Sequence, residues 1–167
     1  ISWAIFLGLC VETGAVIFNT IFALFINPTN ASYFWGIDLS SLYDYDMGHF
    51  LVVTLYMIIT SVMKALMFYL IVKVSQEEKI NLAQPFNQSL VRLISNAAFL
   101  TIGIGLFSYM GVKYVQWLIT KGIEMPAINS LNLEGADIWL FMGVTLLVIA
   151  QIFKRGIEIQ DEHELTV

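Results

Sequence analysis

The chain has 167 residues, of which 58% are hydrophobic and only 13% are charged, and its mean hydropathy is +0.77. A soluble domain of this size cannot bury so much apolar surface, so the composition indicates an integral membrane protein. The net charge of −5 argues against direct binding to nucleic acid, which needs a basic face to neutralise phosphates. Cys10 is the single cysteine, so no internal disulfide can form.

Four apolar stretches are each long enough to cross a bilayer as a helix, which takes about 20 residues. They cover residues 1–26, 47–74, 88–119 and 135–157, and an acidic tail follows at 158–167. The predicted fold class is all-α: a single-domain, integral membrane four-helix transmembrane bundle with up-down topology. The chain opens on Ile1 inside an apolar run, so we expect a further N-terminal piece ahead of it.

The cations that flank the spans predict the orientation, because cytoplasmic loops are enriched in Lys and Arg. One side has Lys73, Lys79, Arg92, Lys154 and Arg155, and the other side has only Lys113 and Lys121. We therefore expect both termini to be cytoplasmic and the loops 27–46 and 120–134 to lie outside. Aromatic residues, typical of the headgroup level, gather near the expected outer ends: Tyr33, Phe34, Trp35, Tyr43, Tyr45, Tyr114, Trp117 and Trp139.

Two charged residues are predicted to lie within the bilayer at similar depths. At 1.5 Å per residue, Lys64 lies about 25 Å and Glu12 about 21 Å from the outer ends of their spans. Asn96 and Gln151 fall in the same half of the third and fourth spans, so we predict one polar layer of these four residues. Since unpaired charges in lipid cost several kcal/mol, we favour a structural ion pair that fixes helix register. The alternatives are a proton or ion relay, a site for a polar headgroup, and a Lys64 that snorkels toward the phosphates.

Small residues follow one face of the third span: Ala97, Thr101 and Gly105 are four residues apart, and Ser108 comes next. Small side chains let a neighbouring helix approach closely, which is how membrane helices gain packing energy. We therefore predict a helix-packing face, in preference to a groove that binds a ligand.

Asp44, Asp46 and His49 cluster at the start of the second span. Carboxylates and an imidazole could bind a divalent cation, but such residues more often cap a helix N-terminus and face water. They are weak metal candidates, and we predict neither a metal nor a cofactor. No catalytic triad, zinc-protease motif or glycine-rich phosphate loop is present, so the sequence does not indicate an enzyme.

Several stretches together resemble one known family: residues 36–43, 64–73, 85–86 and 102–106, and above all the closing segment 150–167. They are similar to the bacterial membrane family known as domain of unknown function 2975, especially its Bacteroidetes-type members. The resemblance covers essentially the whole chain and implies four transmembrane helices, a bacterial inner membrane and a complete C-terminus. Members are often encoded beside a helix-turn-helix regulator, which implies a cytoplasmic protein partner. The family has no established catalytic residues to carry over.

Two functional hypotheses remain. The first is a non-enzymatic membrane sensor or adaptor that passes a signal to a cytoplasmic partner through the 75–88 connection and the tail. The second is a small transporter or channel subunit that uses Glu12 and Lys64. Transporters more often show repeats or interrupted helices, which the sequence does not display, and four spans are few for a pore unless a homo-oligomer forms. A cavity reaching Lys64 from both faces would favour transport, and a closed, dry bundle would favour the adaptor.

Overall fold

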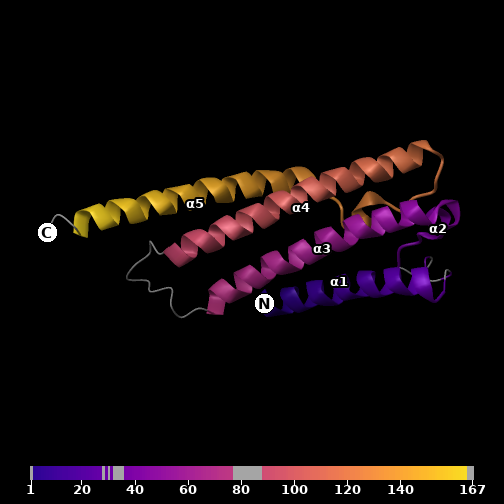
Figure 1. The fold of residues 1–167 in the computed structure, drawn as a ribbon, viewed down its shortest axis with the longest axis horizontal. Coiled ribbons are helices and arrows are strands. Elements are labelled where there is room, and N and C mark those ends of the chain that lie inside the picture. The colour runs from indigo at the N-terminus through magenta and orange to yellow at the C-terminus, as the bar shows by residue number, and fades with distance from the viewer. Residues whose placement is uncertain (1, 28, 30, 32–35, 77–87, 165–167) are drawn as a thin grey trace.

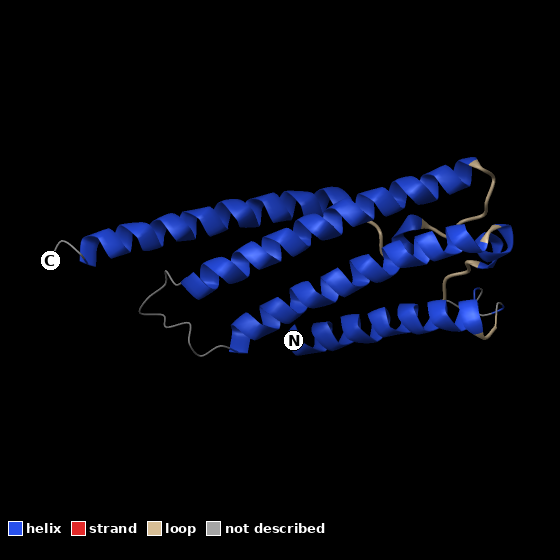
Figure 2. Ribbon diagram, in the orientation of Figure 1, coloured by secondary structure: helices blue, strands red, loops and turns tan. Residues whose placement is uncertain are grey.

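The computed structural model describes residues 2–27, 29, 31, 36–76 and 88–164, so Tyr33, Phe34, Trp35 and Lys79 lie outside the described residues. The regular elements in these ranges are all helical (Figures 1 and 2). They are α1 (Ser2–Phe25), α2 (Ser40–Tyr45), α3 (Met47–Gln76), α4 (Gln88–Thr120), the short 3-10 helix η2 (Ile128–Leu131) and α5 (Ala136–Glu164).

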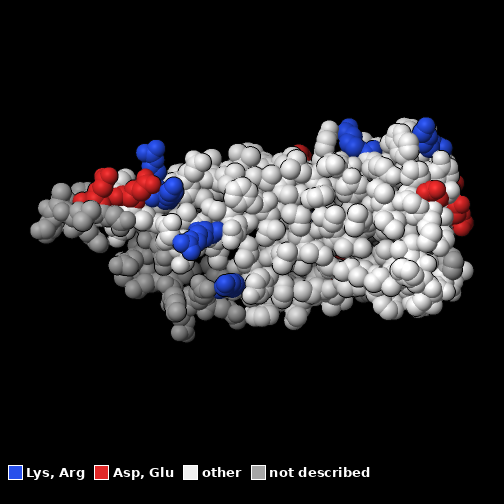
Figure 3. Space-filling view, viewed as in Figure 1, with Lys and Arg blue, Asp and Glu red and all other residues white. Residues whose placement is uncertain are grey.

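Four of these helices, α1, α3, α4 and α5, are long and apolar enough to cross a membrane. The prediction of an all-α fold with four such helices is confirmed, and their bounds differ from the predicted spans mainly at the end of α5. Large apolar side chains point outward: Phe25 is 81% exposed and Phe141 is 76% exposed. Figure 3 shows a wide band nearly free of charge between two charged ends, which is the surface that lipid tails would cover.

The long helices lie in a row, in which α1 packs against α3, α3 against α4 and α4 against α5 (Figure 1). The buried apolar cluster brings together α1, α2, the first turns of α3, the last turns of α4 and the segment after α4. Its fully buried members include Leu39, Leu42, Phe50, Val53, Leu118, Leu131 and Leu133. The core is therefore concentrated at one end of the long helices, where α3 begins and α4 ends.

The short helix α2 was not predicted, and it begins with a turn made by Asp38. The Asp38 carboxylate accepts hydrogen bonds from the Ser40 backbone N–H at 2.9 Å and from the Ser40 hydroxyl at 2.5 Å. These bonds favour the ionised form, so they lower the pKa of Asp38 below its ordinary value. Such aspartate turns compete with regular structure, which explains why the helix starts only at Ser40.

Helices α4 and α5 approach each other at two glycines. A Cβ at Gly105 would lie 2.7 Å from the Leu140 side chain and 3.0 Å from the Ala136 carbonyl oxygen. A Cβ at Gly143 would lie 3.0 Å from the backbone nitrogen of Ile102. Because a backbone atom cannot move aside as a side chain can, both glycines are needed for this close crossing.

The predicted packing face on α4 contacts two different neighbours. Thr101, Gly105 and Ser108 are buried, and Ala97 is partly buried. Gly105 meets α5, whereas the Thr101 hydroxyl lies 3.6 Å from the sulfur of Met67 on α3. This face of small residues therefore lies in the interior of the helix array.

The segment 121–135, which was expected to be a loop on the outer side, folds back between the helices and buries part of its side chains, and the side of the membrane that it faces stays a prediction. Helix α4 continues to Thr120, yet α5 starts at Ala136, beside Gly105. These fifteen residues of α4 correspond to about 22 Å of helix, which the segment must retrace. Leu131 and Leu133 of this segment are fully buried. A loop in water would expose these apolar side chains, which favours the folded-back path.

The acidic residues after 158 also differ from the predicted tail. Helix α5 continues without a break to Glu164, so residues 158–164 extend the last helix. In Figure 1 this end of α5 projects beyond the start of α4. Glu158, Ile159 and Glu162 on this helix end are exposed.

Candidate functional site

One residue of the returning segment joins the two charges of the bilayer region. The Lys64 amine on α3 donates a hydrogen bond to the backbone carbonyl oxygen of Asn132 at 2.9 Å. The side-chain amide of Asn132 donates a second, short hydrogen bond to Oε1 of Glu12 on α1. Asn132 thus bridges a cation and an anion that come from two different helices.

The backbone of Asn132 explains why an asparagine suits this position. Asn132 ends η2 in the left-handed conformation, with φ 58° and ψ 23°. Asparagine adopts this conformation more readily than most residues, because its short polar side chain can bond locally. Its own N–H is bonded to the carbonyl of Asn129 at 3.3 Å, so its carbonyl oxygen and side-chain amide remain for Lys64 and Glu12.

Apolar and aromatic side chains surround these polar groups. A cavity of about 180 Å³ is lined by Glu12, Ser61, Lys64 and Asn132 together with Leu9, Phe68 and Trp139. The Lys64 amine lies 5.8 Å from the centre of the Trp139 ring, which is within the range of a cation–π contact. Since Trp139 belongs to α5, the site gathers α1, α3, α5 and the segment before α5. Electrostatic interactions are stronger here than in water.

A comparison with known families identifies the family of this chain. The sequence model of a family described as a protein of unknown function, DUF2975, matches residues 11–167. The chain belongs to the DUF2975 family. The matched range includes Glu12, Lys64, Asn132 and Trp139, and with four apolar helices this DUF2975 member is a multi-pass membrane protein. No curated protein and no solved structure matches the chain.

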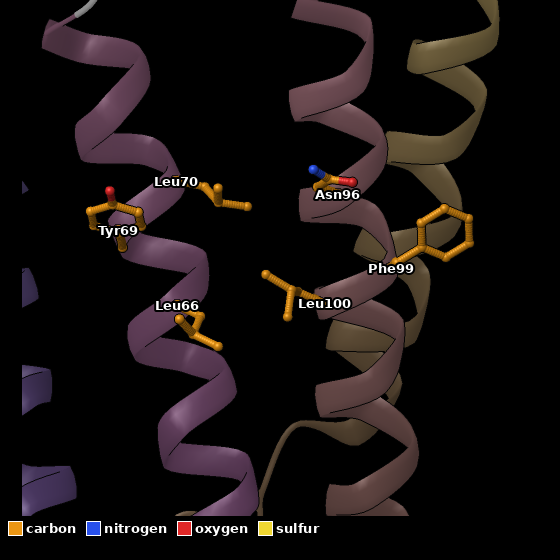
Figure 4. Close-up of a pocket in the computed structure, with 6 residues that line it drawn as sticks. All are labelled: Leu66, Tyr69, Leu70, Asn96, Phe99 and Leu100. Carbon is orange, nitrogen blue, oxygen red and sulfur yellow. The ribbon is translucent and has the colours of Figure 1, made fainter.

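Only two of the four residues predicted for a polar layer contribute to this site. Glu12 and Lys64 are brought together by Asn132. Asn96 is exposed and lines a gap between α3 and α4, where its amide lies near Leu70 and Leu100 (Figure 4). Gln151 is exposed on α5. The predicted depths placed these residues at similar levels, but they did not fix the direction in which each helix presents them, which changes by about 100° per residue.

Asn132 was not predicted as a site residue in this DUF2975 chain, although the sequence carries a signal for it. A single amide stands between Leu131 and Leu133, which are both fully buried. An apolar, polar, apolar pattern within a supposed outer loop indicates a segment that packs on a core. The partners Glu12 and Lys64 lie 120 and 68 residues away, so no local pattern could identify them.

The weak metal candidates have other bonding partners. Asp46 Oδ1 accepts the backbone N–H of His49 at 2.9 Å, as a residue that caps the start of α3 does. The Nδ1 atom of His49 lies 2.6 Å from the Tyr114 hydroxyl, and the Trp117 ring lies 5.6 Å from the imidazole. Asp44 is exposed. Across the described ranges, no three His, Cys, Asp or Glu side chains are grouped so that they could hold a metal ion.

Proposed function

We propose that this protein is a non-enzymatic membrane sensor or adaptor of the bacterial inner membrane. The observation that carries the proposal is the bridge that Asn132 makes between Glu12 and Lys64, four residues before α5 begins. The bridge holds the segment 121–135 in one position. A signal that releases it would shift the start of α5.

Helix α5 is suited to transmit such a shift. Its 29 residues form one unbroken helix, about 44 Å long at 1.5 Å per residue. It begins beside the site and ends in the acidic residues that project beyond α4 (Figure 1). A continuous helix moves as a body, so a displacement at Ala136 reaches Glu164.

The proposed orientation follows the cations. Lys73, Arg92, Lys154 and Arg155 are on the cytoplasmic side in this proposal, with up-down topology and both termini in the cytoplasm. The end of α5 would then face a cytoplasmic protein, for which a helix-turn-helix regulator is the candidate by family association. Self-association into a homo-oligomer is compatible with the same arrangement.

The coupling can be measured as a distance. Spin labels at Ser89 on α4 and Gln160 on α5, in a Cys10→Ala background in lipid nanodiscs, report how the end of α5 sits. Asn132→Ala should change the distance distribution, whereas Asn129→Ala, an exposed neighbour in η2, should leave it unchanged. A distribution that is identical in Asn132→Ala and in the parent protein would contradict the proposed coupling.

A second candidate, a small transporter or channel subunit, is favoured by one specific observation. The charged pair is joined by the irregular segment between α4 and α5, and transporters use interrupted segments of this kind to bind ions. Proteoliposomes that contain a pH-sensitive dye would report proton movement. Flux that is present in the parent protein and lost in Glu12→Gln would support transport over the adaptor.

A further inference from the structure

A furrow runs between α3 and α4 toward the end of α3 and the start of α4. Its apolar part, of about 500 Å³, is lined by Leu66, Tyr69, Leu70, Asn96, Phe99 and Leu100 (Figure 4). A second part, of about 240 Å³, is lined by Leu70, Lys73, Ser89, Arg92, Leu93 and Asn96. Leu70 and Asn96 line both parts, so the two cavities adjoin along the same pair of helices, and together they are called the furrow.

The chemistry of the furrow changes along its length. Leu66, Leu70 and Leu100 lie along the gap between the helices, and the amide of Asn96 stands beside them (Figure 4). Beyond Asn96, the described lining contains the two cations Lys73 and Arg92 and no carboxylate. Arg92 and Asn96 are four residues apart on α4 and therefore share one helix face. The furrow thus has an apolar length and a cationic mouth.

We propose that this furrow binds an anionic phospholipid of the surrounding bilayer. Its phosphate would lie between Lys73 and Arg92, and an acyl chain would lie along Leu66, Leu70 and Leu100. Arg pairs with phosphate through two parallel hydrogen bonds, and basic pockets between membrane helices are typical sites for anionic headgroups. A free anion in water would leave the apolar length uncovered, whereas a phospholipid matches both parts. The proposal goes beyond the proposed function and does not depend on it.

Native mass spectrometry of the purified full chain tests the charge selectivity. The probes are phosphatidylglycerol and phosphatidylcholine with identical acyl chains. The parent protein should retain the anionic lipid roughly tenfold more than the zwitterionic one, since each surface cation contributes to anionic-lipid attraction. The double variant Lys73→Gln with Arg92→Gln should lose this preference. The control Lys113→Gln with Lys121→Gln removes the same charge elsewhere and should keep it.

A second variant tests the apolar part and separates a lipid from a free phosphate. Leu66→Trp keeps both cations and fills the furrow, so it should also weaken retention of phosphatidylglycerol. Leu66 is 47% exposed, which makes the larger side chain compatible with folding. Unchanged retention in the double cation variant would overturn the proposal. Displacement of the lipid by inorganic phosphate, together with no effect of Leu66→Trp, would show a phosphate site instead and would also overturn it.

Discussion

The Lys64 amine donates its hydrogen bond to a backbone carbonyl, that of Asn132, and this bond joins α3 to a segment 68 residues later in the chain. A charge in a low-dielectric site needs partners that offset its loss of water. Here the carbonyl oxygen, the Trp139 ring and the nearby Glu12 provide them. The fold of the segment 121–135 and the solvation of Lys64 therefore depend on each other.

The bridge can be tested at Asn132 itself. Asn132→Gly keeps a residue that accepts the left-handed backbone but removes the amide, and we expect it to cost about 1–3 kcal/mol of stability, the usual effect of leaving a buried partner unsatisfied. Asn132→Ala should cost about 1 kcal/mol more, because alanine is strained at positive φ. Thermal unfolding in detergent micelles would measure both. The exposed neighbour provides the control, Asn129→Ala, which should stay close to the parent; a neutral Asn132→Gly would contradict the bridge.

The two charges should be coupled through the bridge. Lys64→Met alone leaves the Glu12 carboxylate without its compensating cation, so we expect it to destabilise more than the double variant Lys64→Met with Glu12→Gln. A double-mutant cycle should give a coupling energy of about 0.5–3 kcal/mol. Simple addition of the two single effects would mean that the two charges are not coupled.

The contact between α4 and α5 depends on Gly105. Gly105→Ala would bring a methyl group to 2.7 Å from Leu140 and 3.0 Å from the Ala136 carbonyl oxygen. The helices must then separate, and overpacking of this kind costs about 1–3 kcal/mol. Gly8→Ala is the matched control, since nothing lies within 4 Å of the added methyl group. Equal melting temperatures for Gly105→Ala and Gly8→Ala would contradict the close crossing.

The His49–Tyr114 contact joins the first turn of α3 to the last turns of α4. Tyr114→Phe removes the hydroxyl that lies 2.6 Å from Nδ1 of His49 and keeps the ring. We expect a loss of about 1 kcal/mol, the usual net contribution of one hydrogen bond. Tyr109→Phe, an exposed ring on the same helix, should be close to neutral. The difference between the two melting temperatures measures the bond, and no difference would refute it.

The positions of the long helices could be predicted because length and apolar composition decide them. A run such as 47–74 can only be stable in lipid as a helix, and α3 covers Met47–Gln76. The pattern of Leu131, Asn132 and Leu133 indicates a segment that packs on a core, but the path of 121–135 could not be predicted, because the residues that bury these leucines lie far away in the sequence. Glu12 and Lys64 could be predicted as candidates because they are charged residues within apolar runs. Asn96 and Gln151 show that a similar depth alone does not place a side chain in the site.

The returning segment also has a consequence for the order in which the chain is assembled. Glu12 and Lys64 are synthesised 120 and 68 residues before Asn132, so the ribosome releases both partners before the residue that bridges them. The first two spans can therefore be inserted with their charges unmatched. The bridging residue is added only with the connection between α4 and α5, so a chain that stops before Asn132 lacks the residue that joins Glu12 to Lys64.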